Sequence, residues 1–128
     1  MHSRPQRIGD QIREELSALL QREVKDPGIG FTTITWVRMS ADLQNARVYY
    51  TVLGDAQARK NAARALDRAL PFLRRQIAAR VRLRRAPEFT FQYDESIERS
   101  ERIEQLIEQI HATAPEPGAD SPDREHSE

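Results

Sequence analysis

The 128-residue sequence has no cysteine and only three histidines, and these absences exclude several kinds of chemistry. Without cysteine there is no disulfide and no thiolate nucleophile. The histidines lie near the ends of the chain, and no two of them have metal-ligand spacing. No apolar run approaches the ~18 residues of a membrane span, and the N-terminus lacks the apolar segment of a secretory signal. We therefore expect a soluble cytoplasmic protein with no metal and no other cofactor.

The residue types that could catalyse a reaction stand apart from the partners they would need. Gly28 and Gly30 lie in "DPGIG", which lacks the Lys and Ser/Thr of a phosphate-binding loop. Ser40 has no histidine nearby in the sequence and no nucleophile-elbow motif. Asp94 and Glu95 are adjacent carboxylates, which helix capping explains better than acid–base catalysis. We predict no catalytic residue and no enzyme activity.

Charge is unevenly distributed, although 20 basic and 20 acidic residues give zero formal net charge. From Thr113 onward there is no Leu, Ile, Val, Phe, Tyr or Trp, and five acids outweigh one arginine. Such a segment cannot bury enough apolar surface to offset the entropy lost on ordering. We therefore expect residues 112–128 to form a disordered acidic tail and residues 4–111 to form a basic domain.

Hydrophobic periodicity predicts an α+β domain. Ser3 is predicted to cap a first helix, along which apolar residues recur at helical spacing, and the turn residues "DPG" end that helix near Lys25. Strands are predicted at Phe31 to Met39, Ala46 to Leu53 and Glu88 to Tyr93, with an antiparallel hairpin between the first two. The last strand, "EFTFQY", alternates, so its aromatic residues should point inward and the residues between them outward.

Pro71 interrupts the long helical pattern between the second and third strands. A helix capped by Asp55 should kink or restart there, because proline lacks a backbone donor and clashes with the preceding turn. The second helix should reach Ala86, and Ser96 should cap a last helix. The predicted order is α-β-β-α-kink-α-β-α, a two-layer domain with helices on one sheet.

Residues 59–85 contain ten basic residues and one acid, Asp67. Arginine has a planar fork of donors that suits phosphate geometry, so a helix face rich in arginine is typical of nucleic-acid binding. The alternative is a solvated face with i,i+4 ion pairs, for which the second helix offers no acid before Glu88. Trp36, Tyr49 and Tyr50 are either core or half-buried residues or a stacking platform for bases. The predicted RNA contacts are Arg64, Arg68, Arg74, Arg75, Arg80, Arg82, Arg84 and Arg85.

The interruption at Ala69, Leu70 and Pro71 resembles the junction between the two central helices of a KH RNA-binding domain. That junction usually has a GXXG loop, which is absent here. An ordinary helical hairpin is the alternative.

Several stretches resemble the bacterial ribosome-binding factor A family over about residues 4–110. They are "RPQRIGDQIREELSALLQREVKDPGIG", "VRMSADLQNARVYYTVLGD", "RALDRALPFLRRQIAARVRLRRAPEFTFQYDES" and the following "IERSERIEQLI". The resemblance implies a type II KH-like fold and a non-enzymatic protein that binds the free 30S subunit but not assembled 70S ribosomes. It also implies a role in late maturation and 16S rRNA processing, with contact near the 5′-terminal helix of that RNA.

The family has an Ala-X-Gly kink, and here Pro71 stands where glycine is expected. Proline has no N–H to offer a phosphate there. Other small-subunit assembly factors, including a GTPase, are further expected partners, and we expect a monomer. A generic KH-type binder of single-stranded RNA and a protein–protein adaptor remain as alternatives.

Overall fold

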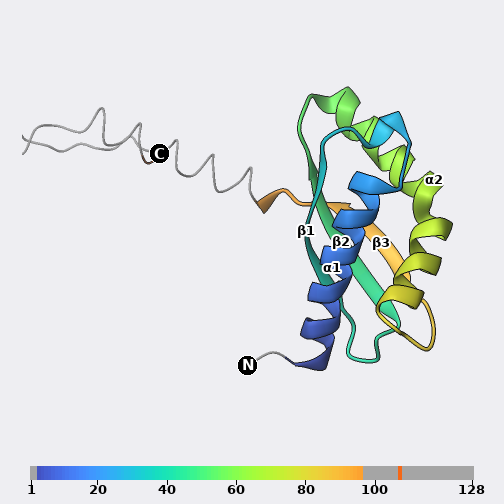
Figure 1. Cartoon of the computed structure of the whole chain (residues 1–128). Coiled ribbons are helices and arrows are strands. Elements are labelled where there is room, and N and C mark those ends of the chain that lie inside the picture. The colour runs from blue at the N-terminus through green and yellow to red at the C-terminus, as the bar shows by residue number, and fades with distance from the viewer. Residues whose placement is uncertain (1–2, 97–106, 108–128) are drawn as a thin grey trace, which may run out of the picture. The chain divides into compact units, whose positions relative to one another are not determined.

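The computed structural model describes residues 3–96 and residue 107, and its elements confirm the predicted α+β class. In chain order they are α1 (Arg4–Arg22), the short 3-10 helix η1 (Pro27–Ile29), β1 (Thr32–Met39), β2 (Asn45–Val52), α2 (Ala56–Arg80) and β3 (Glu88–Tyr93) (Figure 1). All of them belong to one compact unit that ends at Asp94, and a second unit begins at Glu95. The helix predicted after Ser96 and the predicted acidic tail lie outside the described residues, except for Ser96 and Ile107.

Helix α1 begins at the predicted cap. The Ser3 hydroxyl accepts a hydrogen bond from the Gln6 backbone N–H at 3.3 Å, and the Gln6 side chain accepts one from the Ser3 N–H at 2.9 Å. This capping box satisfies two backbone donors at the helix start. The predicted apolar stripe is also confirmed, since Ile12, Leu16 and Leu19 are fully buried.

The sheet has the order β1-β2-β3, with β1 antiparallel to β2 and β2 parallel to β3. The predicted hairpin is therefore correct, and α2 provides the crossover that a parallel pair requires. Val37 pairs with Val48, which pairs with Phe91, so one apolar row crosses all three strands. The alternation predicted for β3 is confirmed, because Phe89 is buried while Thr90 and Gln92 are exposed.

Both long helices contribute to one core against the same face of the sheet. Leu66, Leu73 and Ile77 of α2 are fully buried in it. Helix α1 approaches β1 closely at Gly9, where an added Cβ would lie 2.6 Å from the Val37 carbonyl oxygen. Only a glycine permits this contact between a helix and a strand backbone.

Helix α2 is continuous across Pro71, so of the two predicted outcomes the restart as a second helix is wrong. Its ribbon changes direction along its length in Figure 1. Proline inside a helix costs roughly 3 kcal/mol. Leu66 precedes Pro71 and Leu73 and Ile77 follow it, and all three are buried in the same core. Burial of these side chains outweighs the proline penalty.

The same helix ends at Arg80, earlier than the predicted Ala86. Val81 is the C-cap, and Arg82 has a left-handed φ of 59°. The Leu83 N–H then bonds to the Ala78 carbonyl at 3.0 Å, as in a Schellman motif. Leu83 packs against the core, and this contact stabilises the early end. Arg82, Arg84 and Arg85 therefore lie on a loop and not on a helix face.

Candidate nucleic-acid interface

The eight arginines predicted to contact RNA fall into two groups. Arg68, Arg74 and Arg80 are engaged with other parts of the fold. The other five are exposed, and within residues 3–96 and 107 their side chains form no ion pair or hydrogen bond. These five, called the exposed arginines below, are Arg64, Arg75, Arg82, Arg84 and Arg85.

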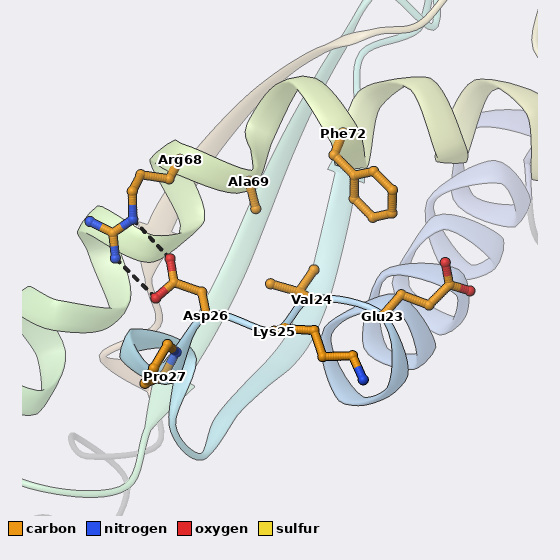
Figure 2. Close-up of a pocket in the computed structure, with 8 residues that line it drawn as sticks. All are labelled: Glu23, Val24, Lys25, Asp26, Pro27, Arg68, Ala69 and Phe72. Atoms are coloured by element: carbon orange, nitrogen blue, oxygen red, sulfur yellow. Dashed lines mark hydrogen bonds and ion pairs between the residues drawn. The ribbon is translucent and has the colours of Figure 1, made fainter.

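Arg68 fastens the turn after α1 to α2, as Figure 2 shows. Its Nε donates to Asp26 Oδ2 at 2.8 Å and its Nη2 to Asp26 Oδ1 at 3.1 Å. The same carboxylate caps η1 by accepting from the Gly28 N–H at 2.9 Å. The bonds from Arg68 and Gly28 lower the pKa of Asp26, and its carboxylate in turn raises the pKa of Arg68. Gly28 lets η1 sit against α2, since a Cβ there would meet the Asn61 carbonyl at 3.0 Å.

The cleft beside this pair is nearly neutral. It is lined by Glu23, Val24, Lys25, Asp26, Pro27, Arg68, Ala69 and Phe72 (Figure 2). Two basic side chains are balanced by two acidic ones. The cleft contains Ala69 of the predicted junction, but its charge balance does not favour an anion.

Arg80 and Arg74 also hold elements together. Arg80 donates from Nη1 to Glu15 Oε1 at 3.2 Å and from Nη2 to Glu23 Oε2 at 2.7 Å, which joins α2 to α1. The hydrogen bond to Glu15 and then that to Glu23 raise the pKa of Arg80. Arg74 donates from Nε to the Pro87 carbonyl at 3.0 Å and lies 3.3 Å from Glu88 Oε2, which fixes the chain entering β3.

Arg68, Arg74 and Arg80 are therefore ion-paired, but not through the i,i+4 pairs of the alternative. The sequence argument counted the lack of acids on the helix against ion pairing, but the acids come from other elements. Glu15 and Glu23 lie on and just after α1, 65 and 57 residues away from Arg80. Whether these three arginines also contact RNA stays a prediction.

Three of the exposed arginines line a basic cleft at one end of the domain. This cleft, of about 630 Å³, lies between the start of α1, the β1–β2 loop and the loop after α2. Its five arginines outnumber its two acids, Asp42 and Glu88, and Glu88 is already paired with Arg74. The cleft thus presents excess positive charge, which suits a phosphate backbone. Its charged lining residues are Arg4, Arg74, Arg82, Arg84, Arg85, Asp42 and Glu88.

Arg4 is the cleft residue that sequence reasoning missed. It lies in the first turn of α1, more than seventy residues from the arginines it joins. No local pattern marks it, because only the packing of α1 on the sheet brings it to the cleft.

The other two exposed arginines lie on the solvent side of α2. Arg64 and Arg75 are eleven residues apart, close to three full turns of 3.6 residues, and so project from the same side of the helix. They flank Pro71, which is also exposed.

Other kinds of site have no counterpart in the described part of the chain. Across residues 3–96 and 107, no three histidine, aspartate or glutamate side chains are grouped to hold a metal ion. Within the same described residues, no helix combines the length and the apolarity needed to cross a membrane.

The sequence model of one protein family, described as ribosome-binding factor A, matches residues 4–107. The fold is also similar to solved structures. The crystal structure of ribosome-binding factor A from Thermus thermophilus is 30% identical, with a TM-score of 0.63. The match covers 71% of this chain and 97% of that one.

Two further structures are similar to the chain. One is a homology model of the Thermus thermophilus factor fitted into a cryo-electron microscopy map of a 30S–RbfA complex. It is 31% identical with a TM-score of 0.58, and the match covers 68% of this chain and 91% of that one. The other is the solution NMR structure of a candidate ribosome-binding factor A from Thermotoga maritima, with 33% identity and a TM-score of 0.58, covering 76% and 96%.

Proposed function

Because the chain belongs to the ribosome-binding factor A family, whose members are non-enzymatic ribosome assembly factors, we propose that it binds the free 30S subunit and not assembled 70S ribosomes. It would assist late maturation of that subunit and processing of 16S rRNA, with contact near the 5′-terminal helix of the RNA. The observation that carries the proposal is the family match over residues 4–107, which spans all the described elements. The Thermus relative fitted into a 30S complex supports the choice of particle.

The exposed arginines are the proposed phosphate contacts. Arg82, Arg84 and Arg85 offer guanidinium groups around the basic cleft that pair with no described residue, and Arg64 and Arg75 offer two more along α2. Such groups bind phosphates bidentately and position a protein on RNA without reading its bases. Arg68, Arg74 and Arg80 are proposed to act mainly by holding the fold that presents the others.

We propose that the domain corresponds to a type II KH-like fold that works without a GXXG loop. Pro71 is exposed on α2, but it has no N–H with which to contact a phosphate. Side chains would therefore replace backbone amides as the phosphate contacts around Ala69, Leu70 and Pro71. This arrangement argues against a generic KH-type binder of short single strands.

The maturation role predicts an RNA-processing defect in cells that lack the protein. Unprocessed 16S precursor should accumulate in free small subunits, and the wild-type gene should restore the mature ends. A gene with Arg82, Arg84 and Arg85 changed to Gln should not restore the mature ends, because the phosphate contacts are lost. Northern analysis of subunit RNA measures both forms.

The matched control is Arg7, Arg22 and Lys25 changed to Gln, which removes equal charge from exposed positions on and after α1. This control should restore processing. Normal 16S ends in cells without the protein would contradict the maturation role.

A further inference from the structure

The face of the sheet turned away from α1 and α2 has a regular pattern of aromatic and basic side chains. In one row, Trp36 of β1 pairs with Tyr49 of β2. In the next row, Arg38 pairs with Arg47, which pairs in turn with Thr90 of β3. Their neighbours Val37 and Val48 point into the core, so these side chains point outward.

The aromatic row is stacked and open. The rings of Trp36 and Tyr49 lie 4.7 Å apart with an interplanar angle of 4°. Trp36 nevertheless remains 44% exposed, whereas Tyr50 on the opposite face is only 6% exposed. The core role considered for the aromatic residues therefore holds for Tyr50 but not for Trp36. A large ring held flat by its neighbour is suited to stack on another planar group.

The basic row is electrostatically unfavourable as it stands. Arg38 and Arg47 are directly opposite each other on adjacent strands, an arrangement in which like charges destabilise a sheet. Both are exposed, and among the described residues neither has an acidic partner. They line a hollow of about 440 Å³ together with Ser40, Asn45 and Thr90, none of which is acidic. A bound anion would relieve the repulsion.

We propose that this outer face binds an unpaired nucleotide of single-stranded RNA, with the base stacked on Trp36 and the phosphate held by Arg38 and Arg47. The outer-face site is defined as Trp36, Arg38, Arg47 and Tyr49. Its two rows are two residues apart along the strand, or about 7 Å. A stacking surface beside a cationic groove is the combination with which proteins bind single strands. The choice of RNA over DNA rests on the proposed function.

The site differs from the basic cleft in both place and chemistry. The cleft has arginines but no exposed aromatic residue among those that line it, so it suits a phosphate backbone alone. The outer face adds a ring for a base. A protein partner would also need to bring acids to Arg38 and Arg47, and this possibility is one outcome of the test.

Intrinsic fluorescence tests the site directly, because Trp36 is the only tryptophan in the chain. Single-stranded oligoadenylate should quench it saturably through stacking. Changing Arg38 and Arg47 to Gln should weaken binding about tenfold near 0.15 M salt and reduce the salt slope by about 1.4, at 0.7 per contact. With a labelled oligonucleotide, Trp36→Leu should weaken binding roughly 5- to 150-fold, whereas Trp36→Phe should weaken it less.

Two further probes and one control variant show whether quenching comes from base stacking at the outer-face site. Duplex RNA and inorganic polyphosphate should not quench, because neither offers an unstacked base. The control Arg7→Gln with Arg22→Gln removes the same charge and should leave quenching unchanged. Circular dichroism and urea unfolding establish that each variant is folded.

The proposal would be overturned if oligoadenylate did not quench the fluorescence, or if polyphosphate quenched it equally. It would also be overturned if the Trp36→Leu variant bound RNA as tightly as the wild type. The proposal would also fail if Trp36→Leu weakened binding to small subunits while oligoadenylate did not quench the wild-type fluorescence. The partner of the outer face would then be a protein.

Failure of this site and failure of the proposed function are distinguishable. The variant with Arg82, Arg84 and Arg85 changed to Gln should keep its quenching by oligoadenylate while losing small-subunit binding. Quenching by a wild-type protein that binds no small subunit would refute the proposed function and leave the outer-face site standing.

Discussion

Changing Arg82, Arg84 and Arg85 together to Gln is expected to lower the affinity for free small subunits about 100-fold near 0.15 M salt. Each phosphate contact contributes roughly 0.7 to 0.9 log units of affinity per log unit of salt. Losing three contacts should therefore lower the affinity by about two log units. The slope of log affinity against log salt concentration should fall in magnitude by about 2 to 3. The three side chains are exposed and have no partner among the described residues, so the fold should be unaffected. Binding is measured by titrating labelled protein with subunits at several salt concentrations.

The equal-charge control at Arg7, Arg22 and Lys25 separates a local contact from a general charge effect. It should lower affinity by much less than the cleft variant, because these residues lie outside the basic cleft. Equal losses in the two variants would mean that net charge alone drives binding. An unchanged affinity of the cleft variant would place the RNA contact elsewhere.

Gly9→Ala is expected to reduce the free energy of unfolding by about 1–3 kcal/mol. The new Cβ would lie 2.6 Å from the Val37 carbonyl oxygen, a backbone atom that cannot rotate away. Helix α1 must then move off β1, which loosens the core around Ile12 and Leu16. Alanine favours the helix over glycine by about 1 kcal/mol, so a net loss can come only from the clash. Urea unfolding measures the change.

The control for this prediction is Asp10→Ala on the same helix. Asp10 is exposed, so alanine there should be neutral or slightly stabilising. A Gly9→Ala protein as stable as the wild type would show that α1 does not lie this close to β1.

Local signals in the sequence were sufficient for most of the fold. Ser3 and Asp55 have capping side chains, and each was found at the start of its helix. The alternation in "EFTFQY" correctly assigned the two faces of β3. These features depend on neighbours within a few residues, which a sequence pattern records directly.

Local rules failed where distant packing decided the outcome. Pro71 predicted a kink or a restart, but burial of Leu66 and Leu73 on either side of it keeps α2 from restarting as a second helix. The basic run predicted a helix through Arg85, but the packing of Leu83 and the left-handed conformation of Arg82 end it early. Neither effect has a sequence signature of its own.

At the candidate site, too, local sequence signals were informative and long-range contacts were not predictable. Arginine composition marked a basic region, yet it could not separate the arginines that hold the fold together from those that stay exposed. Arg80 and Arg68 pair with acids more than forty residues away, and Arg4 joins the cleft from the start of the chain. The opposed Arg38 and Arg47 depend on strand register, which the sequence alone left undetermined.

The central claim is that the protein binds the free small subunit through its exposed arginines, and sedimentation tests it most directly. Wild-type protein would be centrifuged with free small subunits and with assembled ribosomes at low and high salt. The account predicts co-sedimentation with free small subunits alone and a steep loss at high salt, because phosphate contacts release counterions. Equal association with assembled ribosomes, or no association of a folded protein with either particle, would contradict it.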